Sequence, residues 1–102
     1  MARLIQAQNY ARNSGLRVEY SEDVRRQLSK LDNTIKKRIL DYMDEVEKLD
    51  NPRSRGKRLV GNLRGLWRYR VGDYRTLCKI KDDVLEILVV EIGHRRAVYD
   101  DN

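Results

Sequence analysis

Three arginines, Arg68, Arg70 and Arg75, have the spacing of a phosphate-binding cluster. In an extended segment successive side chains alternate between two faces, so Arg68 and Arg70 share a face opposite to that of their apolar neighbours. A two-residue turn at Gly72-Asp73 sets Arg70 directly opposite Arg75 and leaves Arg68 one diagonal step away. Like charges placed this way destabilise a sheet by about 0.2–1 kcal/mol. Because forked guanidinium donors match phosphate oxygens, the pattern indicates a site for a phosphodiester. The alternative is that the three side chains splay apart into solvent.

The run Gly-His-Arg-Arg-Ala-Val-Tyr at residues 93–99 follows a predicted strand and brings further polar groups to its end. His94, the single histidine of the chain, could transfer a proton, but alone it cannot build a metal site. Tyr99 could stack on a base or relay a proton. The alternative for both residues is a packed or solvated side chain without a chemical role.

Positive charge is concentrated in one part of the chain. Residues 53–75 contain eight basic residues and one acid, Asp73, a net charge of +7, so the rest of the chain is nearly neutral within the total of +6. A charge run is often only a solvated face, but with the arginine geometry it favours a polyanionic partner. We therefore predict nucleic-acid contacts at six further positions: Arg53, Arg55, Lys57, Arg58, Arg64 and Arg96.

Two helices precede this region. Ser21 is a predicted N-cap followed by two acids, and Val24, Leu28 and Leu31 then recur at helical spacing. Asp32-Asn33 interrupts this helix. A second helix is predicted for residues 34–49 and ends before Pro52. Its apolar stripe consists of Ile35, Ile39, Met43, Val46 and Leu49.

Four strands complete the expected fold. Residues 16–20 alternate apolar and charged side chains, and three more strands are predicted at residues 66–71, 74–80 and 84–92. The last of these is almost continuously apolar and is expected to be central. The order β-α-α-β-β-β predicts an α+β domain in which a helical hairpin packs on one face of a small, mostly antiparallel four-stranded sheet.

Composition limits the remaining possibilities. The chain has 102 residues, enough for one domain, which we expect to span residues 16–102 after a flexible arm or appended segment at residues 1–15. No apolar run has the length of a membrane span or of a secretory signal, so we expect a cytoplasmic protein without a membrane partner. The single cysteine, Cys78, is expected to be buried and inert. We predict no metal and no cofactor.

The chain resembles the RelE/ParE toxin superfamily, and specifically its RelE ribonuclease branch. The resemblance covers residues 16–99 and is most specific in WRYRVGDYR (residues 67–75) and GHRRAVY (residues 93–99). It implies the toxin of a type II toxin-antitoxin system. Such a toxin is an endoribonuclease that cleaves messenger RNA in the A site of the 70S ribosome and is held inactive by an acidic, RelB-like antitoxin that folds on binding.

The resemblance also assigns catalytic residues. The basic positions of the family fall on Arg68, Arg70, Arg75 and Arg95, and its C-terminal tyrosine falls on Tyr99. The implied reaction is metal-independent attack of the 2′-hydroxyl on the adjacent phosphate. Some relatives carry lysine where this chain has Arg68 or Arg70, and arginine cannot act as a base. The general base is therefore open between His94, which we favour, Tyr99, ribosomal RNA, and simple orientation of the hydroxyl.

Two other functions fit the same sequence. A ParE-like toxin has this fold but inhibits DNA gyrase, and its relatives generally lack the arginine set and the C-terminal tyrosine. A non-catalytic nucleic-acid-binding module would bind phosphates through the basic stretch without chemistry.

Overall fold

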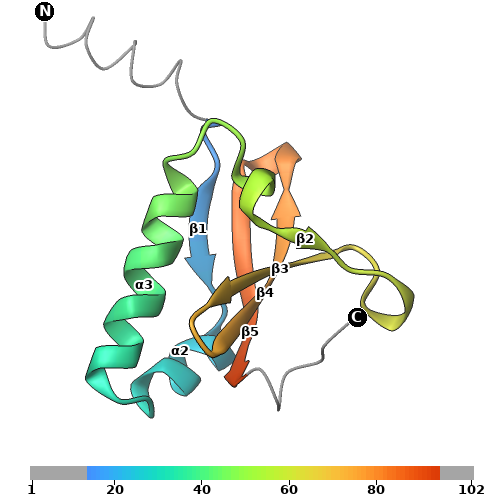
Figure 1. Cartoon of the computed structure of the whole chain (residues 1–102). Coiled ribbons are helices and arrows are strands. Elements are labelled where there is room, and N and C mark those ends of the chain that lie inside the picture. The colour runs from blue at the N-terminus through green and yellow to red at the C-terminus, as the bar shows by residue number, and fades with distance from the viewer. Residues whose placement is uncertain (1–13, 95–102) are drawn as a thin grey trace, which may run out of the picture.

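The computed structural model describes residues 14–94, which form two helices packed on a mixed sheet (Figure 1). The expected α+β architecture is confirmed, and the helical hairpin covers one face of the sheet. Within the described residues the sheet has five strands in the order β1-β5-β4-β3-β2. β1 runs parallel to β5, and the other neighbouring strands are antiparallel.

The first helix begins at its predicted cap, and the second is capped by Asp32, which was expected only to interrupt the first. Ser21 accepts a hydrogen bond from the Val24 amide and starts α2, Glu22–Ser29. Asp32 accepts one from the Thr34 amide and starts α3, Asn33–Glu47. No helix among residues 14–94 is long and apolar enough to cross a bilayer.

The strands are β1 Arg17–Tyr20, β2 Lys57–Arg58, β3 Leu66–Val71, β4 Tyr74–Lys81 and β5 Glu86–His94. Short 3-10 turns lie at Pro52–Arg55, Gly61–Leu63 and Asp82–Val84. β5 lies between β1 and β4, so it is an interior strand as expected, although β4 is the middle one.

Two differences from the expected strands are corrections. β2 was not expected, because two residues are too few to show the alternation that identifies a strand. The last strand begins at Glu86 rather than at residue 84, because Leu85 adopts a left-handed conformation (φ +53°) that ends the preceding turn.

The main core lies between the helices and the sheet. Val24, Ile39, Met43 and Val46 pack there against strand residues that include Tyr69. Cys78 is buried in this core, as expected, and burial raises the pKa of its thiol to about 12. We call this side of the sheet the helix face and the opposite side the arginine face, since Arg68, Arg70 and Arg75 belong to it by strand alternation.

Candidate phosphate-binding site

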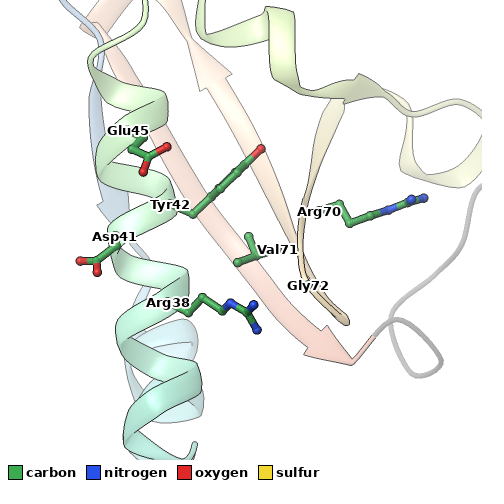
Figure 2. A pocket seen from close by; sticks show the side chains of 7 residues that line it. All are labelled: Arg38, Asp41, Tyr42, Glu45, Arg70, Val71 and Gly72. Carbon is green, nitrogen blue, oxygen red and sulfur yellow. The ribbon is translucent and has the colours of Figure 1, made fainter.

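The β3-β4 hairpin positions the arginines in the predicted register. Arg70 pairs with Arg75 and Arg68 pairs with Leu77 across the two strands. Gly72 has a φ of +60°, which glycine adopts without strain and which allows the tight turn. Figure 2 shows Val71 pointing toward α3 and Arg70 pointing away from it, as alternation requires. The three arginines therefore share one face of the sheet.

This face is less open than the sequence suggests. Arg70 is exposed, but Arg68 and Arg75 are only 9% and 4% exposed. Part of the same face carries a second apolar cluster, in which the buried Leu59 and Leu77 are flanked by Leu63, Leu66 and Val90. The segment that follows β2 supplies Leu59 and Leu63, and Figure 1 shows it on the side of the sheet away from α3. Buried guanidinium groups are held in place before any ligand arrives.

β2 adds a lysine to the arginine face. Lys57 pairs with Arg68 and so shares its face, and Lys57 is exposed. We expected Lys57 only as one of several nucleic-acid contacts. Its position beside Arg68 depends on β2, and that strand gave no signal in the sequence.

Two other predicted nucleic-acid contacts, Arg53 and Arg58, lie beside Trp67 on the helix face. The Arg53 guanidinium binds both Asp82 carboxylate oxygens, at 3.3 and 2.7 Å, and lies 5.5 Å from the Trp67 ring centre. These contacts hold the pKa of the Asp82 carboxyl below its usual range. The Arg58 guanidinium lies 5.7 Å from the same ring centre, and Trp67 belongs to the helix face of β3.

Arg55 and Arg64 are also separate from the arginine cluster. Arg55 Nη1 lies 3.1 Å from Glu45 Oε1 of α3, and its guanidinium lies 5.9 Å from the Tyr42 ring centre. Arg64 is exposed at the end of the Gly61–Leu63 turn. The basic stretch that looks continuous in the sequence is thus divided between two faces and a loop.

A β-bulge in β5 decides which polar residues reach the arginine face. Leu77 pairs with Glu91, but Cys78 pairs with Val89, so Val90 is an extra residue. The bulge reverses the alternation for the following residues and returns Ile92 to the helix-face core. Glu91, which is exposed, therefore lies on the arginine face.

His94 lies on the helix face because of the same bulge. It pairs with Tyr74, and the two rings make an edge contact with centres 5.5 Å apart. The structure therefore does not bring His94 into the arginine cluster. Three other predicted site residues, Arg95, Arg96 and Tyr99, lie outside the described residues.

A hollow of about 290 Å³ lies beside the hairpin, between α3 and the end of β3 (Figure 2). Its lining consists of Arg38, Asp41, Tyr42 and Glu45 of α3 and Arg70, Val71 and Gly72 of the hairpin. Because the Arg70 side chain points away from it, the hollow is on the opposite side of β3 from the arginine cluster. Among residues 14–94 no group of three or more His, Cys, Asp or Glu side chains could hold a metal ion.

The arrangement can bind and polarise a phosphate. Guanidinium groups remain protonated at any working pH, so they can donate hydrogen bonds to phosphate oxygens but cannot remove a proton. The carboxylate of Glu91 was not expected at this site, because regular alternation would place it on the helix face. No sequence signal identifies the extra residue at position 90.

Comparisons with known proteins agree with this fold. A family model described as ParE toxin of type II toxin-antitoxin system, parDE, matches residues 18–99. The RelBE2 toxin-antitoxin complex of Mycobacterium tuberculosis contains a chain that is 27% identical, with a TM-score of 0.71 over 78% of this chain and 98% of that one. The archaeal RelE-RelB complex of Pyrococcus horikoshii gives 26% identity and a TM-score of 0.66 over 82% and 99% of the two chains.

A mutant of the Escherichia coli toxin RelE in the free state has a TM-score of 0.62 at 16% identity over 85% and 86% of the two chains, which shows similarity of fold alone. No curated protein matches the sequence significantly.

Proposed function

Because the chain belongs to the ParE toxin family of type II toxin-antitoxin systems, within the RelE/ParE superfamily, we propose that it is a RelE-type, ribosome-dependent endoribonuclease. It cleaves messenger RNA in the ribosomal A site and thereby stops translation. Its action is in the cytoplasm, where the 70S ribosome is found, and it needs neither metal nor cofactor.

The observation that carries this proposal is the arginine cluster. Arg70 and Arg75 lie directly opposite each other, with Arg68 on the same face. Forked guanidinium donors gathered on one face match the oxygens of a phosphodiester, so the cluster suits RNA as a ligand. A gyrase inhibitor has no need to surround a phosphate. The similarity to RelE chains in two toxin-antitoxin complexes, at 26–27% identity, also favours the RelE branch.

In the proposed reaction the 2′-hydroxyl of the messenger attacks the adjacent phosphorus, and the bond to the 5′-oxygen breaks. The products are a 2′,3′-cyclic phosphate and a 5′-hydroxyl. Arg70 and Arg75 orient the phosphate and stabilise the charge that accumulates on it, a preorganised effect that is typically worth several kcal/mol. Arg68, together with Arg95 and Tyr99 from the family motif, completes the proposed catalytic set.

The partner that inhibits this activity is a RelB-like antitoxin. Two similar structures are toxin-antitoxin complexes with RelB proteins. We propose that the antitoxin of this chain is acidic, folds on binding and covers the arginine face, where messenger RNA would otherwise bind.

The deciding experiment adds the purified chain to ribosomes that carry a defined messenger and maps the new 5′ ends by primer extension. Cuts confined to the A-site codon support the proposal. An intact messenger, together with inhibition of gyrase supercoiling by the same preparation, would instead support ParE-like function. Binding to RNA without cleavage or gyrase inhibition would indicate a non-catalytic module.

A further inference from the structure

Glu91 is a carboxylate next to the arginine cluster. It pairs with Leu77 in the neighbouring strand β4, and Arg75 lies two residues before Leu77 on the same face. Glu91 is therefore the diagonal neighbour of Arg75 across antiparallel strands. Such neighbours are separated by about 7–8 Å.

The bulge at Val90 is responsible for this position. Without the extra residue, alternation from Val89 would place Glu91 on the helix face, in the apolar layer beneath the helices. Bulges commonly redirect a side chain next to an active site. Here the bulge puts an acid among phosphate-binding groups.

Glu91 makes no ion pair with any residue that the structure describes, although it belongs to the face that carries the arginines. Glu86, the other β5 acid on this face, differs in its ion pairing and in its place along the strand. It lies at the far end of the strand, paired with Lys81, and its Oε1 is 3.6 Å from Lys81 Nζ. Glu91 is thus available to a ligand bound over the arginines.

Of the residues that the structure describes around the arginine cluster, the three guanidinium groups cannot accept a proton, whereas Glu91 can. A glutamate carboxylate is ordinarily ionised at neutral pH, whereas guanidinium groups cannot accept a proton. His94, the base expected from the sequence, lies on the helix face beside Tyr74. The separation between Arg75 and Glu91 leaves room for a phosphate on the arginine and the neighbouring 2′-hydroxyl near the carboxylate.

We infer that Glu91 is the general base of the cleavage, an inference that rests on the proposed ribonuclease function. Its carboxylate removes the proton of the 2′-hydroxyl as that oxygen bonds to phosphorus. The bond between phosphorus and the 5′-oxygen breaks at the same time, and the 5′-oxygen takes a proton from water. The product is a 2′,3′-cyclic phosphate, and the proton on Glu91 returns to solvent.

Single-turnover cleavage on programmed ribosomes, measured from pH 5 to 9, tests this role. Glu91→Gln keeps the shape of the side chain but cannot accept the proton, and general-base loss typically costs about 10²–10⁴ in rate. We expect a loss of rate in this range. We also expect the parent's rate to fall toward acid pH and the rate of Glu91→Gln to show no such fall. Glu91→Asp keeps a carboxylate and should recover part of the rate together with that acid-side decline.

Glu86→Gln is the matched control, because it removes an acid from the same strand and face but away from the arginines. It should cleave like the parent, and thermal melting should show that all variants are folded. A Glu91→Gln variant that cleaves within about threefold of the parent, with the same pH profile, overturns the inference and leaves the ribonuclease function intact. A parent chain that leaves the messenger uncut overturns both.

Discussion

Arg70 and Arg75 face each other across the hairpin although their charges repel. Two guanidinium groups held on one face can bind the oxygens of the same phosphodiester. Arg70 is exposed, so it can be removed without leaving a cavity, whereas Arg75 is almost completely buried. The exposed member of the pair is therefore the better residue for separating activity from folding.

We predict that Arg70→Ala changes the free energy of unfolding by less than about 0.5 kcal/mol, as is usual for surface positions. Cleavage should fall about 10²–10³-fold, by analogy with the loss of one donor to a developing negative charge. Denaturant unfolding and single-turnover cleavage measure the two effects. Arg58→Ala is the control, since Arg58 is also exposed but lies against Trp67 on the helix face. Equal losses of activity in both variants would mean that the cluster contributes only general positive charge.

A second residue-scale prediction concerns Asp82, whose pKa the Arg53 guanidinium lowers. When the pKa of a carboxyl is lower in the folded than in the unfolded state, its charged form stabilises the fold at any pH above the unfolded pKa. This stabilisation is lost as the pH falls through the folded pKa. Asp82→Asn should therefore lower the Tm at neutral pH, and the difference from the parent should shrink toward zero on acidification. Added salt should reduce it as well, because the pair is exposed. Asp83→Asn, the adjacent acid, is the comparison, and a difference that stayed constant with pH would argue against the ion pair.

At the scale of elements, the hairpin turn sets the register of the arginines. Gly72 has a positive φ, and a Cβ there would lie 3.3 Å from Nη1 of Arg38. We predict that Gly72→Ala destabilises the chain by about 1–2 kcal/mol, the usual cost of a left-handed conformation for an L-residue. Denaturant unfolding measures it. Gly61→Ala, with φ +66° and no neighbour within 4 Å, isolates the backbone cost from the Arg38 contact. Unchanged stability in Gly72→Ala would show that the turn tolerates another conformation.

The elements also show what could be predicted from the sequence. The caps at Ser21 and Asp32, and the register of Arg70 with Arg75, depend on local chemistry that nearby residues specify. The bulge at Val90 instead depends on how β5 fits β4 and on which side chains the core accepts. No local pattern in the sequence shows that fit, so Glu91 was not identified from the sequence and His94 was placed among the candidate catalytic residues.

The division of the basic stretch between two faces also depends on contacts between residues that are distant in the sequence. Arg53 and Arg55 belong to a 3-10 turn whose start is capped by Asn51, and they meet acids that are distant in the sequence, Asp82 and Glu45. Counting charges along the chain cannot separate residues that pair within the fold from those that face a ligand. The structure distinguishes these two kinds of basic residue and limits the candidate site to the arginine face.

For the whole molecule, the excess of positive charge predicts how the antitoxin binds. If an acidic antitoxin covers the arginine face, its affinity should fall as salt rises from low to high ionic strength, because exposed charges are screened. Titration calorimetry at several salt concentrations measures this dependence, and Arg70→Ala should make it shallower. An affinity that is insensitive to salt would favour an apolar contact with the helical hairpin.

The parallel pairing of β1 with β5 affects when the domain can form. Arg17 pairs with Glu86, so the first strand of the described region has no partner until residues 86–94 have been synthesised. Contacts between such distant residues slow folding, because a long loop must close before they contribute. During translation, β3 and β4 can meet as a local hairpin, but the sheet that supports them is incomplete without β5. A newly made chain therefore passes through a period in which the arginine hairpin lacks its supporting strand, and on the proposed function it cannot yet cleave messenger RNA during that period.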